Sequence, residues 1–106
     1  MQEATFLILT ALAAGSRHGY GIIADVDTIS DGRVRLRAGT LYSALDRLRI
    51  DGLVEIDHEE IVEGRLRRYY RLTRDGAQQL SREAAQFQSN AATAFARLGL
   101  AGGGTP

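Results

Sequence analysis

The strongest constraint on the fold of this chain is a change in the period of its hydrophobic residues. Three stretches are predicted helices: residues 2–14 are apolar on most faces, and residues 19–29 and 39–49 have apolar residues at helical spacing. Two later runs, 53–57 and 65–72, alternate apolar and polar residues. A spacing of about 3.6 residues is typical of a helix, and alternation is typical of a strand with one buried face. We therefore predict three helices followed by a β-hairpin.

Two connecting segments refine this prediction. Residues 33–37, Arg-Val-Arg-Leu-Arg, alternate strictly and predict a short strand or an extended lead-in to the third helix. A loop centred on residues 59–64 is expected between the two strands of the hairpin.

A last helix is predicted after the hairpin. Thr73 is placed to act as its N-cap, and Asp75 lies in the first turn, where an acidic side chain complements the helix dipole. Apolar residues then recur in a heptad-like, alanine-rich seam, which predicts the close approach of a partner helix. The seam consists of Leu80, Ala84, Phe87, Ala91, Ala94 and Leu98.

Length and composition exclude several classes of protein. The chain has 106 residues, 44% of them hydrophobic, which fits one domain near the lower end of what a single core stabilises. It has no cysteine, so disulfides, thiol chemistry and cysteine-ligated zinc are excluded. No apolar run approaches the roughly 20 residues of a membrane span, and no basic region precedes the first apolar stretch. We expect a cytoplasmic protein without a membrane partner.

The distribution of charge points to the middle of the chain. All 13 basic residues are arginine, and they balance 13 acidic residues. Residues 33–74 hold ten arginines and seven acids, a net of +3, whereas residues 1–32 have a net of −3. Arginine makes bidentate contacts with phosphate and guanine that lysine does not reproduce. The middle third is therefore where we look for an anionic partner.

Three helices followed by a hairpin form the winged helix-turn-helix arrangement, a mainly α fold with a small β-hairpin. In such motifs the third helix meets base edges in the DNA major groove, while flanking arginines hold phosphates. Its polar face here includes Asp46, a candidate acceptor for cytosine N4 or a partner that positions Arg47 or Arg49. The predicted DNA-binding residues are Arg35, Arg37, Thr40, Tyr42, Ser43, Arg47, Arg65, Arg67, Arg68 and Tyr69.

Four short motifs stand in register over residues 5–76. They are His18-Gly-Tyr-Gly-Ile-Ile23, Gly39-Thr-Leu-Tyr-Ser-Ala-Leu45, Arg47-Leu48 with Asp51-Gly-Leu53, and Arg68-Tyr-Tyr-Arg-Leu-Thr73 followed by Gly76. Together they resemble the PadR-like transcriptional regulators. The resemblance implies a DNA-binding repressor of the short subclass, with Thr40, Tyr42 and Ser43 on the reading helix and Arg65–Arg71 in the wing.

The resemblance also implies that a single C-terminal helix crosses to a second subunit. It divides the chain into a winged helix-turn-helix domain over 1–76, a dimerisation helix over 77–98 and a disordered tail over 99–106. The residues expected at the dimer interface, or around a small hydrophobic or aromatic effector bound there, are Phe6, Leu9, Leu80, Phe87, Phe95 and Leu98.

Two departures from the family pattern bear on DNA contact. Arg37 stands where a small capping residue is usual before the reading helix, so the start of that helix is expected to depend on a phosphate or another group for its cap. The wing loop is acidic, because residues 55–63 contain five acids and no arginine. Backbone phosphates should repel a wing tip with that charge.

Structural roles compete with DNA contact for the wing arginines. Glu55 and Asp57 are predicted to oppose Arg65, Arg67 and Arg71 across the ladder. Such cross-strand ion pairs explain Arg65 and Arg67 as well as DNA contact does. Arg68 falls on the apolar side of its strand, and the alternative for it is an acid in the helical core.

The tyrosines have alternatives of the same kind. Tyr42 either contacts DNA, which we favour because it adjoins the buried Leu41, or packs at the edge of the core. Tyr20 and Tyr70 are expected to pack inside, with their hydroxyl groups satisfied at the surface. Tyr69 faces outward beside arginine, where it could touch phosphate.

No catalytic constellation is apparent. His18 and His58 lie on different elements without metal-ligand spacing, and no glycine-rich phosphate loop or cysteine nucleophile is present. We expect neither an enzyme nor a cofactor. The predicted function is a homodimeric repressor that binds a pseudo-palindromic operator on double-stranded DNA and is released by a small effector. The alternative is a winged-helix module that docks a protein partner through its acidic wing.

Overall fold

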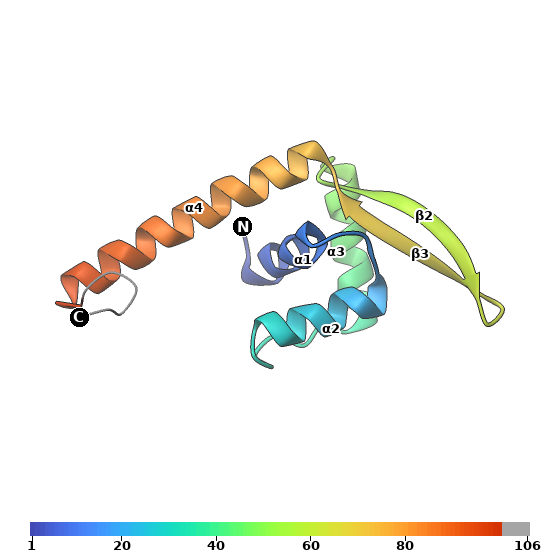
Figure 1. Ribbon diagram of the computed structural model, residues 1–106, viewed down its shortest axis with the longest axis horizontal. Coiled ribbons are helices and arrows are strands. Elements are labelled where there is room, and N and C mark those ends of the chain that lie inside the picture. The colour runs from blue at the N-terminus through green and yellow to red at the C-terminus, as the bar shows by residue number, and fades with distance from the viewer. Residues whose placement is uncertain (101–106) are drawn as a thin grey trace.

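The computed structural model describes residues 1–100, which form four helices and a three-stranded sheet. Figure 1 shows the first three helices gathered together, with the hairpin and the last helix projecting in opposite directions. The predicted order of three helices, a hairpin and a last helix is confirmed. The elements are α1 (Glu3–Ala13), β1 (Arg17–His18), α2 (Gly19–Ile29), α3 (Ala38–Ile50), β2 (Val54–Val62), β3 (Arg65–Leu72) and α4 (Arg74–Arg97).

Helices α1, α2 and α3 share one apolar core. Helices α2 and α3 each turn an apolar stripe inward and a polar face to solvent, whereas α1 is apolar on most of its faces. The base of the wing closes the core with Val54 and Tyr70. The buried apolar residues are Leu7, Ile8, Leu9, Ala11, Leu12, Ile22, Val26, Leu41, Leu45, Leu48, Val54 and Tyr70.

The segment between α2 and α3 is extended but is not a strand. Val34 and Leu36 pack against the core, and the arginines that alternate with them face solvent. The buried Ser30 accepts a hydrogen bond from the backbone N–H of Val34 at 3.0 Å, which anchors the segment where it leaves α2. Of the two forms predicted for residues 33–37, the structure has the extended lead-in.

The sheet contains a third strand that the sequence did not reveal. Strand β1 pairs with β3, with Arg17 opposite Tyr70 and His18 opposite Tyr69, so that the strand order is β1-β3-β2. Two residues are too few for an alternating pattern to show in a sequence. The strand ties the start of α2 to the wing.

The hairpin is longer than predicted. Strand β2 continues to Val62, so the loop expected around 59–64 is wrong, and the chain turns over Glu63 and Gly64 alone. Both turn residues have positive φ, 52° and 77°, as a two-residue hairpin turn of type I′ requires. The extension follows from the ladder, where acids of β2 face arginines of β3. A bulge at Asp57 shifts the register near the base.

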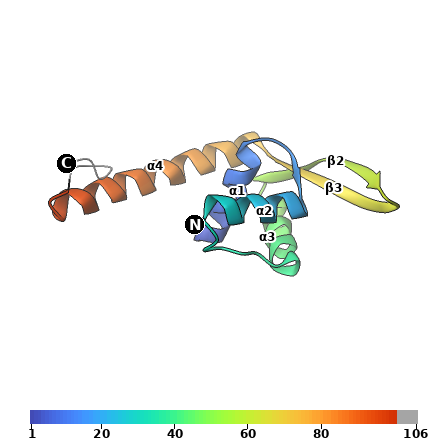
Figure 2. The ribbon, with the colours of Figure 1, turned by 60° about the horizontal axis from the view of Figure 1, so that its bottom comes forward.

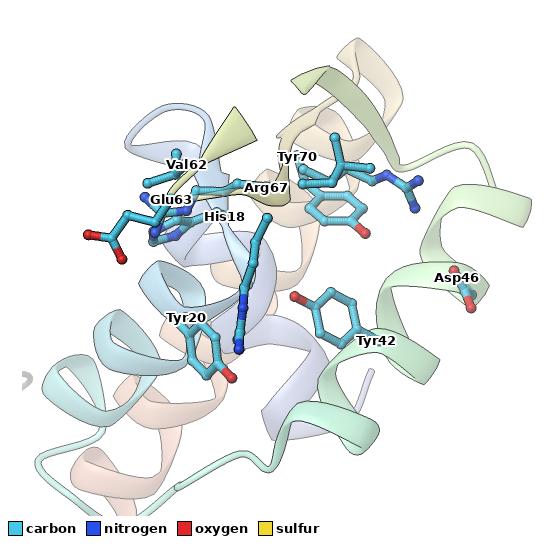
Figure 3. Close-up of a pocket in the computed structure, with 12 residues that line it drawn as sticks. His18, Tyr20, Tyr42, Asp46, Val62, Glu63, Arg67 and Tyr70 are labelled. Atoms are coloured by element: carbon cyan, nitrogen blue, oxygen red, sulfur yellow. The ribbon is translucent and has the colours of Figure 1, made fainter. Parts of the chain in front are cut away.

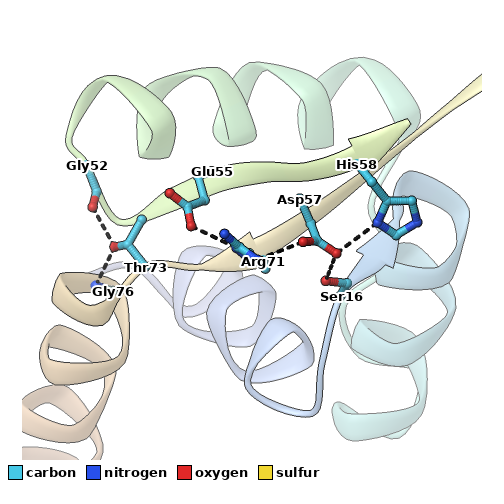
Figure 4. A network of polar contacts seen from close by, with 8 residues as sticks. All are labelled: Ser16, Gly52, Glu55, Asp57, His58, Arg71, Thr73 and Gly76. Carbon is cyan, nitrogen blue, oxygen red and sulfur yellow. Dashed lines mark hydrogen bonds and ion pairs between the residues drawn. The ribbon is translucent and has the colours of Figure 1, made fainter. Parts of the chain in front are cut away.

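Helix α4 starts at the base of the wing and is fixed there. The Thr73 hydroxyl accepts a hydrogen bond from the N–H of Gly76 at 3.0 Å, which confirms it as the N-cap, and donates to the Gly52 carbonyl at 2.6 Å (Figure 4). A Cβ at Gly76 would collide with the carbonyl oxygen of Leu53. Glycine is therefore required at this crossing.

Most of α4 extends beyond the core, as both Figure 1 and Figure 2 show. Phe6 of α1 meets Phe87 edge-on with ring centroids 4.9 Å apart, yet Phe87 remains 43% exposed. Further along the predicted seam, Ala94 and Leu98 are exposed. Of the predicted tail, residues 101–106 lie outside the described part of the chain.

Candidate nucleic-acid interface

The outer face of α3 carries the polar residues predicted to read DNA. Leu41, Leu45 and Leu48 are buried on its inner face, which leaves the intervening positions to solvent. The spacing of the leucines fixes this orientation, since residues three and four apart share one side of a helix. Thr40, Tyr42, Ser43 and Arg47 all lie on the exposed side.

A concave surface that encloses a volume of about 810 Å³ lies between α3, the start of α2 and the wing. Figure 3 shows Tyr20 from α2, Tyr42 and Asp46 from α3, and Arg67 from β3 around it. Residues that are far apart in the sequence thus form one continuous surface beside the reading helix.

Tyr20 is the residue of this surface that the sequence analysis misplaced. It was expected inside, but it is 74% exposed. The reason is its helical position: Ile22 and Val26 form the buried stripe of α2, and Tyr20 falls two residues before Ile22, away from that stripe. Tyr70 is buried, as predicted.

Tyr42 is held in a defined place between α3 and α2. Its hydroxyl lies against Gly19, where a Cβ would overlap the hydroxyl oxygen. Burial raises the pKa of Tyr42, and the nearby phenols of Tyr70 and Tyr20 add to the effect. Tyr42 therefore presents a neutral hydroxyl, able to donate and accept, from a ring that is 42% exposed.

The acids at the base of the wing bind one of the three arginines predicted to oppose them. Arg71 donates to Glu55 at 2.8 Å and to Asp57 at 2.7 Å (Figure 4). Register decides this outcome, because Arg71 stands opposite Glu55 across the ladder. The predicted pairing of these acids with Arg71 is confirmed, and their pairing with Arg65 and Arg67 is wrong. The hydrogen bond to Glu55 is the main cause that raises the pKa of Arg71.

Arg68 is also paired within the wing. Its Nε donates to Glu59 on the neighbouring strand at 2.8 Å, so the alternative of an acid in the helical core is wrong. That hydrogen bond, followed by one with Tyr70, raises the pKa of Arg68.

The remaining arginines of this region are free. Within residues 1–100, Arg37, Arg47, Arg65 and Arg67 form no ion pair. They lie on α3, on its lead-in and on the outer half of the wing. Arg35 is intermediate, since it reaches Asp27 only at 3.8 Å and both side chains are well exposed. Three further arginines without an acidic partner in the described chain lie on α4, namely Arg74, Arg82 and Arg97.

The N-terminus of α3 is open, as the departure at Arg37 predicts. Arg37 occupies the N-cap position and makes no side-chain cap hydrogen bond, in contrast to His18 before α2 and Thr73 before α4. The free backbone N–H groups of a first helical turn, together with the helix dipole, bind anions.

The acidity of the wing is partly compensated inside the wing. Besides the pairs of Arg71 and Arg68, Glu60 accepts a hydrogen bond from the Tyr69 hydroxyl at 2.7 Å. Among the five acids of this segment, Glu63 in the turn has no polar partner within the described chain. The repulsion expected from composition is therefore reduced. The Tyr69 ring stacks on His58 at 4.3 Å and, from the other side, near His18 at 5.4 Å.

Asp57 is the centre of the polar network at the base of the wing (Figure 4). Its carboxylate accepts from the Ser16 hydroxyl at 2.7 Å and contacts His58 Nδ1 at 2.8 Å. These two hydrogen bonds, that of Ser16 first, hold the pKa of the Asp57 carboxyl below its ordinary value. The network links the α1–α2 connection to β2 and β3.

The residues predicted for a subunit interface separate into two groups. Leu9 is fully buried in the core of the single chain, so its expected place on a surface between subunits is corrected. Phe6, Leu80 and Phe95 are half-buried, and Phe87 and Leu98 are exposed.

The described residues lack two other kinds of feature. Residues 1–100 contain no group of three or more metal-binding side chains placed to hold an ion. None of their helices has the length and apolar character needed to cross a membrane.

A three-helix core with an exposed polar third helix and a projecting hairpin defines a winged helix-turn-helix protein. The family model described as "Transcriptional regulator PadR-like family" matches residues 8–82, which is more than half of the chain. The chain belongs to the PadR-like family of transcriptional regulators.

Individual relatives agree with this assignment. The chain is 38% identical over 68 residues to the transcriptional regulator Rv3488 of Mycobacterium tuberculosis, a match that covers 64% of this chain and 50% of the relative. It is 43% identical over 82 residues to an uncharacterized 37.1 kDa protein in transposon TN4556 of Streptomyces fradiae, covering 77% of this chain and 22% of the relative. The chain therefore spans no more than half the length of either curated relative.

Solved structures show the same fold. A transcriptional regulator from Clostridium thermocellum superimposes with a TM-score of 0.68 at 26% identity, and the match covers 82% of each chain. PadR of Bacillus subtilis, solved in complex with operator DNA, superimposes with a TM-score of 0.69 at 21% identity, covering 78% of this chain and 47% of that one.

Proposed function

We propose that this regulator acts as a homodimeric repressor that binds a pseudo-palindromic DNA operator. The observation that carries the proposal is the distribution of free cations. Arg37, Arg47, Arg65 and Arg67, all without an ion pair within residues 1–100, surround the exposed face of α3. The arginine at the base of the wing, Arg71, is bound by two acids.

In this proposal α3 lies in the major groove. Thr40, Tyr42 and Ser43 face base edges, and Asp46 lies one turn further along, within reach of a cytosine amino group. The free arginines and the open N-terminus of α3 bind phosphates on either side. Arg35, loosely paired with Asp27, adds to the phosphate contacts, because an exposed pair of this length contributes little.

The dimer is proposed to form through α4 and α1. Most of α4 projects beyond the core with apolar residues exposed, among them Phe87 and Leu98. A second copy would cover this seam, and two-fold symmetry would place two α3 helices on half-sites about 34–36 Å apart. An aromatic effector would find Phe6, Phe87 and Phe95 at this surface.

The biological setting proposed is a cytoplasmic regulator acting near its own gene. A relative in Bacillus subtilis that shares this fold was solved with operator DNA, which supports operator DNA as the partner proposed here. A transcriptional reporter driven by the proposed operator tests the sign of regulation: expression should rise when the regulator is deleted.

Fluorescence-anisotropy titration tests the proposal directly. The full chain is titrated onto labelled DNA from upstream of its own gene, with scrambled DNA of the same composition as control, at two salt concentrations. We expect tight binding that survives competitor and weakens steeply with salt, because bound arginines release counterions from DNA. Equal affinity for the scrambled DNA would contradict the proposal. Sedimentation of the same sample tests the dimer.

A further inference from the structure

His18 links the start of α2 to the wing and is the N-cap of that helix. The backbone N–H of Gly21 donates to its Nδ1 at 3.0 Å. Because a backbone N–H can only donate, Nδ1 must accept, and the hydrogen bond requires the neutral ring with its proton on Nε2. An imidazolium carries a proton on both nitrogens and cannot form this bond. The cap therefore exists only while His18 is uncharged.

The chemistry of this cap differs from that of α4. The Thr73 hydroxyl accepts a hydrogen bond at any pH, whereas histidine changes its charge between about pH 5 and 8. Histidine is also outside the group of Ser, Thr, Asp and Asn that N-cap positions prefer. Among the helices of residues 1–100, α2 is thus the one whose side-chain cap depends on pH.

The capped turn supports the surface proposed to read DNA. His18, Tyr20 and Tyr42 line the same concave surface (Figure 3). Gly19, the first residue of α2, lies against the Tyr42 hydroxyl. The hydrogen bond from Gly21 to His18 spans Gly19 and Tyr20, so it fixes the backbone that carries both residues. Loss of the cap frees the turn that holds the Tyr42 hydroxyl in place.

A charged His18 would have no acidic partner at the cap. Tyr69 of β3 stacks on its ring with the centroids 5.4 Å apart, and the hydroxyl of Tyr69 is bound to Glu60. Within residues 1–100 His18 forms no ion pair, whereas His58, which also stacks on Tyr69, contacts Asp57 at 2.8 Å. A charged His58 therefore keeps a carboxylate partner, and a charged His18 has none.

The charges of the neighbouring elements would not hold a protonated ring in place either. Asp25 of α2 is paired with Arg17 at 3.8 Å, and Asp46 of α3 with Arg49 at 3.9 Å. Glu63 of the wing turn lines the concave surface, but so do three arginines of β3. The arginines and phenols of this surface are Arg65, Arg67, Arg68, Tyr20, Tyr42 and Tyr70. The charged ring would face the positive end of the α2 dipole, which repels it from the cap.

We propose that His18 is a positioning residue for operator binding: as a neutral N-cap it holds the first turn of α2 against Tyr42, and its protonation releases that turn and weakens the complex. The inference rests on the proposed DNA-binding function and adds a dependence on pH to it. Since the bound form requires an unprotonated ring, affinity is full above the range in which histidine ionises and falls as the pH decreases through it. A charged His18 that held a phosphate would give the opposite sign.

Fluorescence anisotropy of the full chain on operator and scrambled DNA tests this inference at about pH 8 and about pH 5.5, above and below the ordinary ionisation of histidine. His18→Asn keeps an acceptor of the preferred kind but does not titrate, and His18→Ala removes the cap. The matched control is His58→Asn, which removes the other histidine of the chain. Thermal unfolding at both pH values checks that every protein is folded during the titration.

We expect the wild type to bind the operator about fivefold more weakly at the lower pH, the factor that corresponds to the usual loss of an N-cap. His18→Asn should match the wild type at the higher pH and keep that affinity at the lower one. His18→Ala should bind more weakly by the same factor at both values. His58→Asn should retain the pH dependence of the wild type.

Three results would overturn the role of His18. They are an equal pH dependence in the wild type and His18→Asn, a failure of asparagine to restore the affinity that His18→Ala loses, and binding that tightens with a steeper salt dependence as the pH falls. Each leaves the proposed function standing, because the operator is still distinguished from scrambled DNA. A wild type that does not distinguish them at either pH overturns the proposed function itself.

Discussion

Strand β3 carries arginines of two kinds at its two ends. Arg71, at the base of the wing, is bound by Glu55 and Asp57, whereas Arg67, four residues away, has no ion pair within the described chain. An arginine held between two carboxylates has its positive charge compensated, and one without an acid keeps its charge for phosphate. Within this one strand, the arginine at the base of the wing therefore has a structural role, and the arginine nearer the tip is available for binding.

The largest expected effect is a loss of stability on disrupting the base of the wing. In Gly76→Ala the new methyl group collides with the backbone of Leu53, which cannot move without displacing β2. We expect a loss of about 3 kcal/mol in the free energy of unfolding, at the upper end for overpacking. Urea denaturation measures it.

Gly39→Ala is the matched control for that substitution. A Cβ at Gly39 meets nothing within 4 Å, and the residue lies in the first turn of α3. Stability should stay the same or rise by up to about 1 kcal/mol. Equal losses of stability in the two variants would contradict the requirement for glycine where Gly76 lies against Leu53.

Substitutions on the exposed face of α3 should alter the selectivity of DNA binding and leave the base of the wing intact. Ser43→Ala or Tyr42→Ala should reduce discrimination between operator and non-operator DNA by roughly 1–3 kcal/mol, the usual range for a good base contact. Gly19→Ala should act in the same direction, because its Cβ displaces the Tyr42 hydroxyl. Competition binding measures the discrimination, with the exposed Thr28→Ala as control. Full selectivity in all three variants would contradict this assignment.

A smaller effect on stability is expected at acidic pH. The pKa of Asp57 is lowered in the folded protein, so its carboxylate stabilises the fold at pH values above its ordinary pKa of 3.8. This stabilisation is lost as the pH falls from there through the lowered value. Asp57→Asn should therefore flatten the decline of the melting temperature below about pH 4. Asp51→Asn, at the exposed end of α3, should leave that decline unchanged.

Much of the fold could be predicted from the sequence because the apolar residues of long amphipathic segments recur with a recognisable period. The stripes of α2 and α3, the N-cap Thr73 and the buried Tyr70 are all local or periodic features, and the structure confirms them. The two-residue strand β1 is too short to have a period. Tyr20 is exposed because it lies two residues before the buried stripe of α2, on another side of the helix.

The pairing of Glu55 and Asp57 with Arg71 was predicted, but the pairs nearer the tip depend on a shift in register. A bulge at Asp57 changes the pairing beyond it, so that Glu59 stands opposite Arg68 and Glu60 opposite Arg67. Composition alone therefore overstated the acidity of the wing. The open N-terminus of α3 was predicted, since Arg37 is a poor capping residue. Which residues contact DNA remains a prediction.

The salt dependence of operator binding in Arg67→Ala and Arg71→Ala tests the central claim most directly. If Arg67 binds phosphate and Arg71 binds acids, then Arg67→Ala should lower the slope of log affinity against log salt by about one for each wing on the DNA. Arg71→Ala should keep the wild-type slope and lose stability instead. Equal slopes in the wild type and Arg67→Ala, or a loss of slope confined to Arg71→Ala, would contradict the division between base and tip.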